Sequence, residues 1–154
     1  MPRTYFSLTL EDAKQMLSAA EAKAATLGIP YCVAVVDAAG HLVAFVRQDC
    51  ALIGSVDLAI GKATTARIFD KTTADLATLA QPGKPLFGIQ EPNAANVVIF
   101  GGGVPVVLDG TIVGAVGASA GTVEQDIAVA EAAIAALGHQ TQSSDAPRSS
   151  RKGS

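Results

Sequence analysis

The fold of this chain is decided by residues 100–119, which read FGGGVPVVLDGTIVGAVGAS. Asp109-Gly110 stands between two β-branched runs, and a two-residue hairpin turn needs residues that accept positive φ at its centre. The pattern therefore predicts two antiparallel strands, at 104–108 and 111–119. Both arms are apolar at nearly every position, which predicts a hairpin in the middle of a sheet, covered on both faces.

Glycines also occur on either side of the predicted turn in this stretch. Gly114 and Gly117 leave gaps along the second arm where a helix or a flat ligand could approach closely, and helix packing is the simpler explanation. The glycines at 101–103 lead into a strand rather than a helix, so no helix N-terminus follows that could hold a phosphate. Backbone freedom explains them better.

Capping signals and apolar periodicity place the other elements. We expect Thr9 to cap a helix that ends at Gly28, Ser55 to cap a helix over 56–69, and Thr122 with Gln125 to begin a last helix that ends at Gly138. Further strands are expected at 31–36, 41–47 and 97–100, and a short helix at 73–79 within a long loop over 70–96. This order predicts an α/β fold, with an antiparallel sheet of about five strands and helices on both faces.

Composition narrows the class of protein. The chain has 154 residues, 49% of them hydrophobic, which is enough for one domain over 1–138, and the Ser-rich segment 139–154 reads as a disordered tail. The tail carries three basic residues and one acid, which leaves the rest at a net charge of −5, so nucleic acid is not an expected partner.

No long apolar run or signal peptide is visible, which predicts a cytoplasmic protein without membrane contact. Two cysteines with no metal-site spacing are expected to be free thiols.

Four blocks of sequence resemble one known family. They are residues 33–49 (VAVVDAAGHLVAFVRQD), 59–63 (AIGKA), 102–105 (GGVP) and 114–126, which includes GAVGAS and Gln125-Asp126. Their content and order resemble the GlcG/HbpS-like haem-binding family and the similar C-terminal domain of PduO. Two positions depart from the family pattern: Cys50 and Ala120 each stand where the family usually shows glycine.

The resemblance implies a profilin-like fold, a homo-oligomer that is often a dimer or octamer, and haem binding or degradation, with members in catabolic operons. On the residues alone, Lys62 interrupts an Ala-rich helix and must either reach solvent or meet an acid. If it is buried near Asp126 or Asp37, it could hold a substrate carboxylate or a haem propionate. Asp37 could equally cap its turn, and Arg47 could pair with Asp49.

An axial donor to haem iron would come from a small set of side chains. The candidates are His41, Cys32, Cys50, Tyr5, Tyr31 and Met16, with His41 as the metal candidate and His139 expected to be inert.

Two functions remain open. As a haem-binding protein, the chain would present Phe69, Phe87, Phe100 or the hairpin glycines to the porphyrin. As a cofactor-free enzyme acting on a small oxo- or hydroxy-acid, it would use Lys62 and Arg47 for the carboxylate and Asp37, Asp49 or Cys50 for proton transfer. The catalytic candidates are Lys62, Asp37 and Cys50. The ligand-binding candidates are Arg47, Asp49, Lys62, Phe87, Phe100, Gly102, Gly103, Ser119 and Asp126. A purely structural partner that oligomerises through its Ala stripes is a third possibility.

Overall fold

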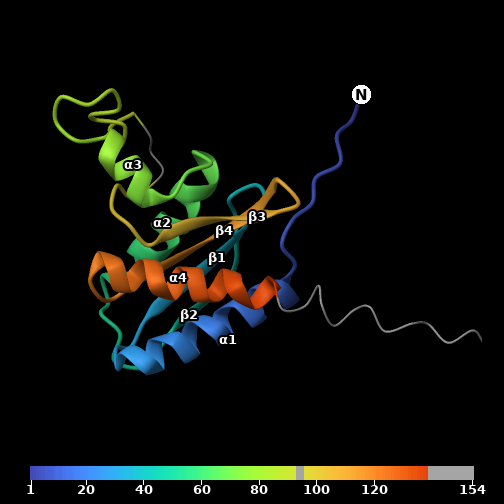
Figure 1. Ribbon diagram of the computed structural model, residues 1–154, viewed down its shortest axis with the longest axis vertical. Helices are drawn as coiled ribbons and strands as arrows, with labels where there is room; N and C mark the ends of the chain where they lie inside the picture. The colour runs from blue at the N-terminus through green and yellow to red at the C-terminus, as the bar shows by residue number, and fades with distance from the viewer. Residues whose placement is uncertain (93–95, 139–154) are drawn as a thin grey trace, which may run out of the picture.

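The computed structural model describes residues 1–92 and 96–138 (Figure 1). Its elements in chain order are α1 (Leu10–Leu27), β1 (Cys32–Asp37), β2 (Leu42–Arg47), α2 (Ser55–Ile68), α3 (Thr73–Leu79), β3 (Gly103–Leu108), β4 (Thr111–Ser119) and α4 (Val123–Gly138). The strands form one antiparallel sheet in the order β2-β1-β4-β3. No helix among the described residues is long and apolar enough to cross a membrane. The predicted tail, 139–154, lies outside the described residues.

Local signals set the ends of two long helices as predicted. Thr9 Oγ1 accepts a hydrogen bond from Asp12 N while the Asp12 carboxylate accepts one from Thr9 N, which is a complete capping box. Gly28 ends α1 with a φ of 68°. At the start of α4, Thr122 and Gln125 exchange the same pair of bonds.

The start of α2 differs from the prediction. Ser55 is the first residue of the helix rather than its cap, and the capping position, Gly54, has no side chain to accept a bond. The Ser55 hydroxyl instead accepts a hydrogen bond from Ser119 Oγ at 3.3 Å. The local sequence predicted that the Ser55 side chain would cap α2, but this side chain bonds to Ser119 on β4 instead.

The Asp109-Gly110 turn is confirmed, with φ values of 48° and 75°. Its two arms have different environments. β4 is central and buried from Val113 onward, whereas β3 is an edge strand that leaves Val107 and Leu108 exposed. The prediction that both arms lie mid-sheet was thus right for β4 and wrong for β3.

The strand predicted at 97–100 does not form, so the sheet within the described residues has four strands rather than about five. Val98 is buried, but its backbone N–H donates to the Thr65 hydroxyl on α2 at 3.0 Å. The segment is held by a helix side chain instead of a neighbouring strand. The short helix predicted at 73–79 is confirmed as α3.

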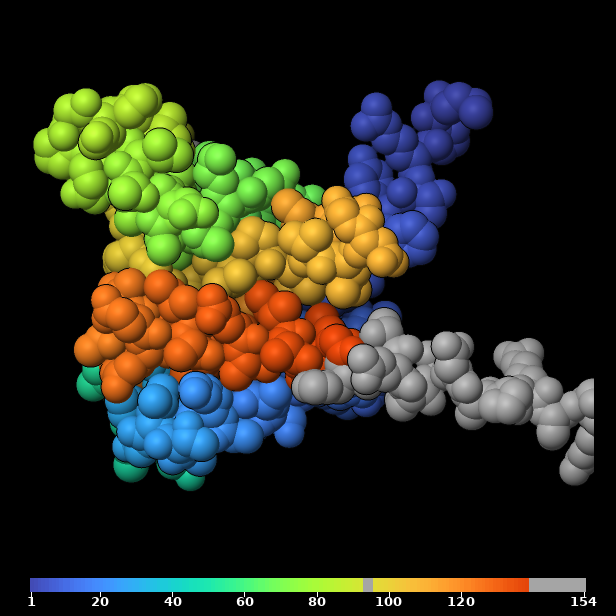
Figure 2. Space-filling model, viewed as in Figure 1, coloured from blue at the N-terminus to red at the C-terminus, as the bar shows by residue number. Residues whose placement is uncertain are grey.

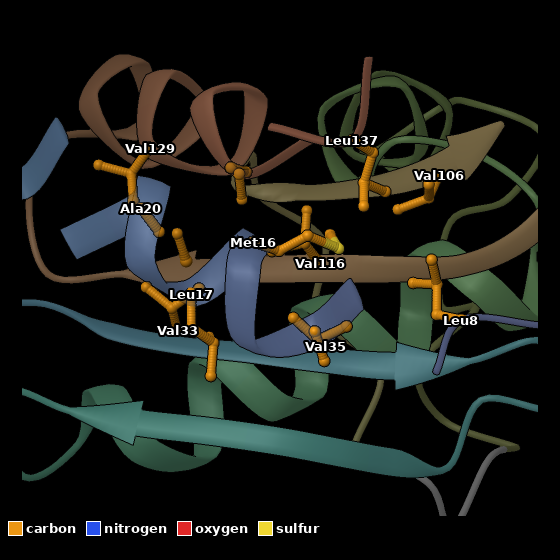
Figure 3. Packing of buried hydrophobic residues seen from close by; sticks show 14 of the residues in the cluster. Leu8, Met16, Leu17, Ala20, Val33, Val35, Val106, Val116, Val129 and Leu137 are labelled. Atoms are coloured by element: carbon orange, nitrogen blue, oxygen red, sulfur yellow. The ribbon is translucent and has the colours of Figure 1, made fainter. Parts of the chain in front are cut away.

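Helices cover both faces of the sheet, as predicted. On one face α1 and α4 pack over Val33, Val35 and Val116, and Figure 3 shows Met16 of α1 beside Val116 and Val129 of α4 beside Ala20. On the other face α2 packs over the second core cluster. This cluster consists of Cys32, Ala34, Val36, Ala51, Ala59, Ala63, Ala66 and Ala115.

Gly117 explains why α2 lies so close to the sheet. A Cβ atom there would collide with backbone atoms of Ala59 and Ala63, so the gap in β4 is filled by the helix. The helix explanation of this glycine is confirmed.

We predict that Gly117→Ala destabilises the fold by about 1–3 kcal/mol or more, because backbone atoms cannot yield as a flexible side chain would. Urea denaturation measures the change. The control is Gly138→Ala, where an added Cβ would have no atom of residues 1–92 or 96–138 within 4 Å. Equal stability of the Gly117→Ala protein and the wild type would contradict this packing.

Candidate functional site

A buried ion pair joins α2 to α4 beside the glycine-rich segment before β3. Lys62 is fully buried, and its Nζ donates to Asp126 Oδ2 at 2.5 Å and to the Ala118 carbonyl at 3.0 Å. The other carboxylate oxygen of Asp126 accepts from the backbone N–H groups of Ala120 and Gly121, at 3.1 and 3.0 Å. Both carboxylate oxygens and the ammonium are therefore occupied by the protein itself.

Two effects act on the Lys62 ammonium. Burial lowers the pKa of Lys62, while the hydrogen bond and charge of Asp126 oppose that shift. The Phe100 ring lies over the ammonium with 4.7 Å between Nζ and the ring centroid, a favourable cation–π distance. Phe100, predicted to bind a ligand, here covers a charge inside the protein.

Gly102, just before β3, and Gly103, its first residue, let the chain pass this pair closely. Gly102 has a φ of 123°, and a Cβ there would lie 2.8 Å from Lys62 Nζ. Gly103 abuts the Lys62 backbone, and its N–H donates to Thr73 Oγ1 at 2.9 Å. The positive φ of Gly102 agrees with the predicted backbone freedom. Gly103 has no such φ, and close approach to the backbone of α2 accounts for it instead.

Tyr31 lies behind Asp126. Its side chain is fully buried, and its hydroxyl has no hydrogen-bond partner among the described residues. Burial raises the pKa of the Tyr31 phenol, and the Asp126 charge raises it further. Sequence reasoning considered Tyr31 only as an iron ligand; its place beside Asp126 follows from the pairing of Cys32 with Ser119 in the sheet.

Asp37 and His41 lie at the other end of β1. That strand runs from Cys32, opposite Ser119, to Asp37, opposite Gly114, a distance of about 17 Å for its length. Asp37 Oδ1 accepts from the N–H groups of Ala39 and His41, so the turn-capping interpretation is confirmed. His41 Nδ1 is 4.0 Å from the same oxygen, and its side chain is 82% exposed.

The remaining candidates are scattered. Arg47, Asp49, Cys50 and Phe87 are exposed, and Ser119 is buried against Ser55. The expected ion pair between Arg47 and Asp49 does not form among the described residues, whose ion pairs join other side chains. The structure thus brings together Lys62, Asp126, Phe100 and the two glycines, and leaves the others apart. His139 lies outside the described residues.

A hollow of about 370 Å³ lies at the Asp37 end of the sheet. It is lined by Tyr5, Ser7, Asp37, Ala38 and Ala39. Sequence reasoning missed this place, because the contact between the N-terminal segment and the turn after β1 carries no local signal. Residues 1–92 and 96–138 contain no cluster of three or more His, Cys, Asp or Glu side chains that could hold a metal ion.

These features define a small α/β protein with an antiparallel sheet between helices, a closed polar pair at one end and an open hollow at the other. Residues 8–135 match the family described as haem degrading protein HbpS-like. A Citrobacter freundii protein, the uncharacterized 15.0 kDa protein in the dhaT-dhaS intergenic region, is 44% identical over 128 residues, which is 83% of this chain and 90% of the relative.

Two solved structures are similar throughout. Klebsiella pneumoniae protein ORFY is 36% identical with a TM-score of 0.87, covering 89% of this chain and 94% of that one. The PduOC:heme complex is 39% identical with a TM-score of 0.81, covering 84% of this chain and 94% of that one. The chain belongs to the HbpS-like family, which confirms the resemblance found in its sequence.

We predict that Lys62→Met destabilises the protein by about 3–5 kcal/mol, because it leaves the Asp126 carboxylate buried without its cation. Chemical denaturation measures the loss. Lys62→Met combined with Asp126→Asn should recover part of it, since the buried charge is then removed while the oxygen that accepts from Ala120 and Gly121 is kept.

The matched control is Lys14→Met, which replaces an exposed lysine on α1 and should change stability by less than about 0.5 kcal/mol. If Lys62→Met and Lys14→Met were equally stable, the buried pair would not hold the fold together.

Proposed function

We propose that this chain binds haem. The observation that carries the proposal is the haem complex of the PduOC domain, which is 39% identical and superposes over 84% of this chain. Identity at this level over nearly the whole domain supports a shared ligand as well as a shared fold. The family description supports the same ligand class.

The donor set of the chain fits haem. Haem iron takes His, Cys, Met or Tyr side chains as axial ligands. Met16, Tyr31 and Cys32 are fully buried, but Tyr5, His41 and Cys50 are accessible. The hollow beside Asp37, at about 370 Å³, falls within the usual range of about 300–1,000 Å³ for ligand sites. When bound, haem would supply redox-active iron, and the chain would supply binding and orientation.

The geometry does not favour the alternative of a cofactor-free enzyme on a small oxo- or hydroxy-acid. One of its two carboxylate anchors, Lys62, is fully buried and already pairs with Asp126, and the other, Arg47, is exposed. Of its three proposed bases, Asp37 lies about a full strand length away at the other end of β1, too far to act on the same small molecule. The other two, Asp49 and Cys50, are exposed.

We further propose that chains self-associate and that the fold is profilin-like, as the resemblance implies. Several large apolar side chains, among them Leu52, Ile53 and Val107, are more than half exposed, which supports an interface that covers them.

Hemin titration of the purified full chain tests the main proposal. We expect a saturable shift of the Soret band that reaches a plateau near one hemin per chain, and a rise in Tm as hemin stabilises the folded state. Absence of a saturable shift would overturn the proposal.

Metal-free protoporphyrin IX serves as the control ligand. Because it lacks iron, it cannot use an axial donor, and we expect it to bind more weakly than hemin. Equal binding of the two would show that apolar contact alone holds the porphyrin.

A further inference from the structure

The hollow beside Asp37 is a shaped feature rather than a loose gap. The N-terminal segment is tied to the sheet by Leu8 N, which donates to the Val113 carbonyl at 2.9 Å. Ala38 N donates to Ser7 Oγ at 3.0 Å, which joins the segment to the turn after β1. Two hydrogen bonds therefore fix the walls between which the hollow lies.

The polar side chains that line this hollow differ in whether they already have a hydrogen-bond partner. Ser7 Oγ accepts from Ala38, and Asp37 Oδ1 accepts from two N–H groups of its own turn, so both groups already have partners. The Tyr5 side chain is 74% exposed, and no hydrogen bond joins its hydroxyl to any described residue. Figure 2 shows the first residues of the chain standing out from the body of the molecule. Tyr5 therefore provides a phenol that is open to an incoming ligand.

Burial separates the potential iron donors further. Met16, Tyr31 and Cys32 are fully inside the core. His41 and Cys50 are exposed, but neither lines the hollow. Among the His, Cys, Met and Tyr side chains that the structure describes, Tyr5 is the one that does.

We infer that Tyr5 provides the axial oxygen ligand to haem iron at the hollow formed by Tyr5, Ser7, Asp37, Ala38 and Ala39. This inference rests on the proposed haem binding. A phenolate is an established axial ligand of haem iron. On coordination the Tyr5 O–H bond breaks, the oxygen donates an electron pair to ferric iron and the proton passes to solvent, with no change of oxidation state. Ala38 and Ala39 add apolar side chains to the lining of the hollow.

The test compares full-length wild type with Tyr5→Phe, using hemin as the probe. Resonance Raman spectra of the ferric complex should show phenolate-to-iron modes in wild type and none in Tyr5→Phe. Hemin affinity should fall about tenfold or more, because even outer partners of a metal ligand contribute that much. Tyr5→Phe removes one oxygen from an exposed side chain, so its Tm without hemin should match wild type.

His41→Ala and Cys50→Ser are the controls, since each removes an exposed donor that does not line the hollow. Both should keep the phenolate modes. If wild type binds hemin but Tyr5→Phe binds equally well with the same spectrum, the ligand assignment is wrong while haem binding stands. If wild type does not bind hemin, haem binding itself fails, and the ligand assignment with it.

Discussion

The structure depends on the charge pair between Lys62 and Asp126, buried where α2, β4 and α4 meet. Residues 64 positions apart in the chain are joined at 2.5 Å, and the lysine also holds the Ala118 carbonyl of the central strand. A buried charge is costly unless it is paired and hydrogen-bonded, and here every oxygen of the carboxylate has a donor. The pair therefore fixes how the helices on the two faces sit relative to β4.

The buried Lys62–Asp126 pair also determines which residues can lie next to it. Gly102 and Gly103 are needed because the chain passes within contact distance of Lys62, and Phe100 covers the ammonium from the outside. These are residues that a sequence reader assigns to a ligand, since glycine, lysine and aromatic side chains often meet in binding sites. In this fold these glycine, lysine and aromatic residues pack against one another. The hollow of about 370 Å³ lies at the far end of β1, around Asp37 and Tyr5, while a smaller one of about 220 Å³ lies beside the pair and is lined in part by Gly102 and Gly103.

The sequence could predict elements whose signals are local. Thr9, Gly28 and Asp109-Gly110 determine their caps and turn through their own backbone and side chains, and each was predicted correctly. Predictions failed where a distant partner decides. Val98 is bound by the Thr65 hydroxyl instead of a strand, and Ser55 is taken by Ser119 instead of its helix.

The candidate site, like the fold, was predictable only where the signal is carried by the residues themselves. The sequence suggested that Lys62, in an Ala-rich helix, would either reach solvent or meet an acid, with Asp126 or Asp37 as the candidate partner. The structure selects Asp126. The sequence could not indicate that the pair would be closed, since that depends on backbone groups of residues 118–121. Nor could it indicate the hollow at Tyr5, which forms only when the N-terminal segment meets the turn after β1.

The central claim is that one end of the sheet is a closed structural pair and the other is the ligand-binding end. Amide NMR spectra of the chain, recorded as paramagnetic ferric hemin is added, test it most directly. The account predicts that signals of Ser7 and of residues 37–41 broaden first, while those of Ala118 and Asp126 persist. Broadening centred on Ala118 and Asp126 would contradict it.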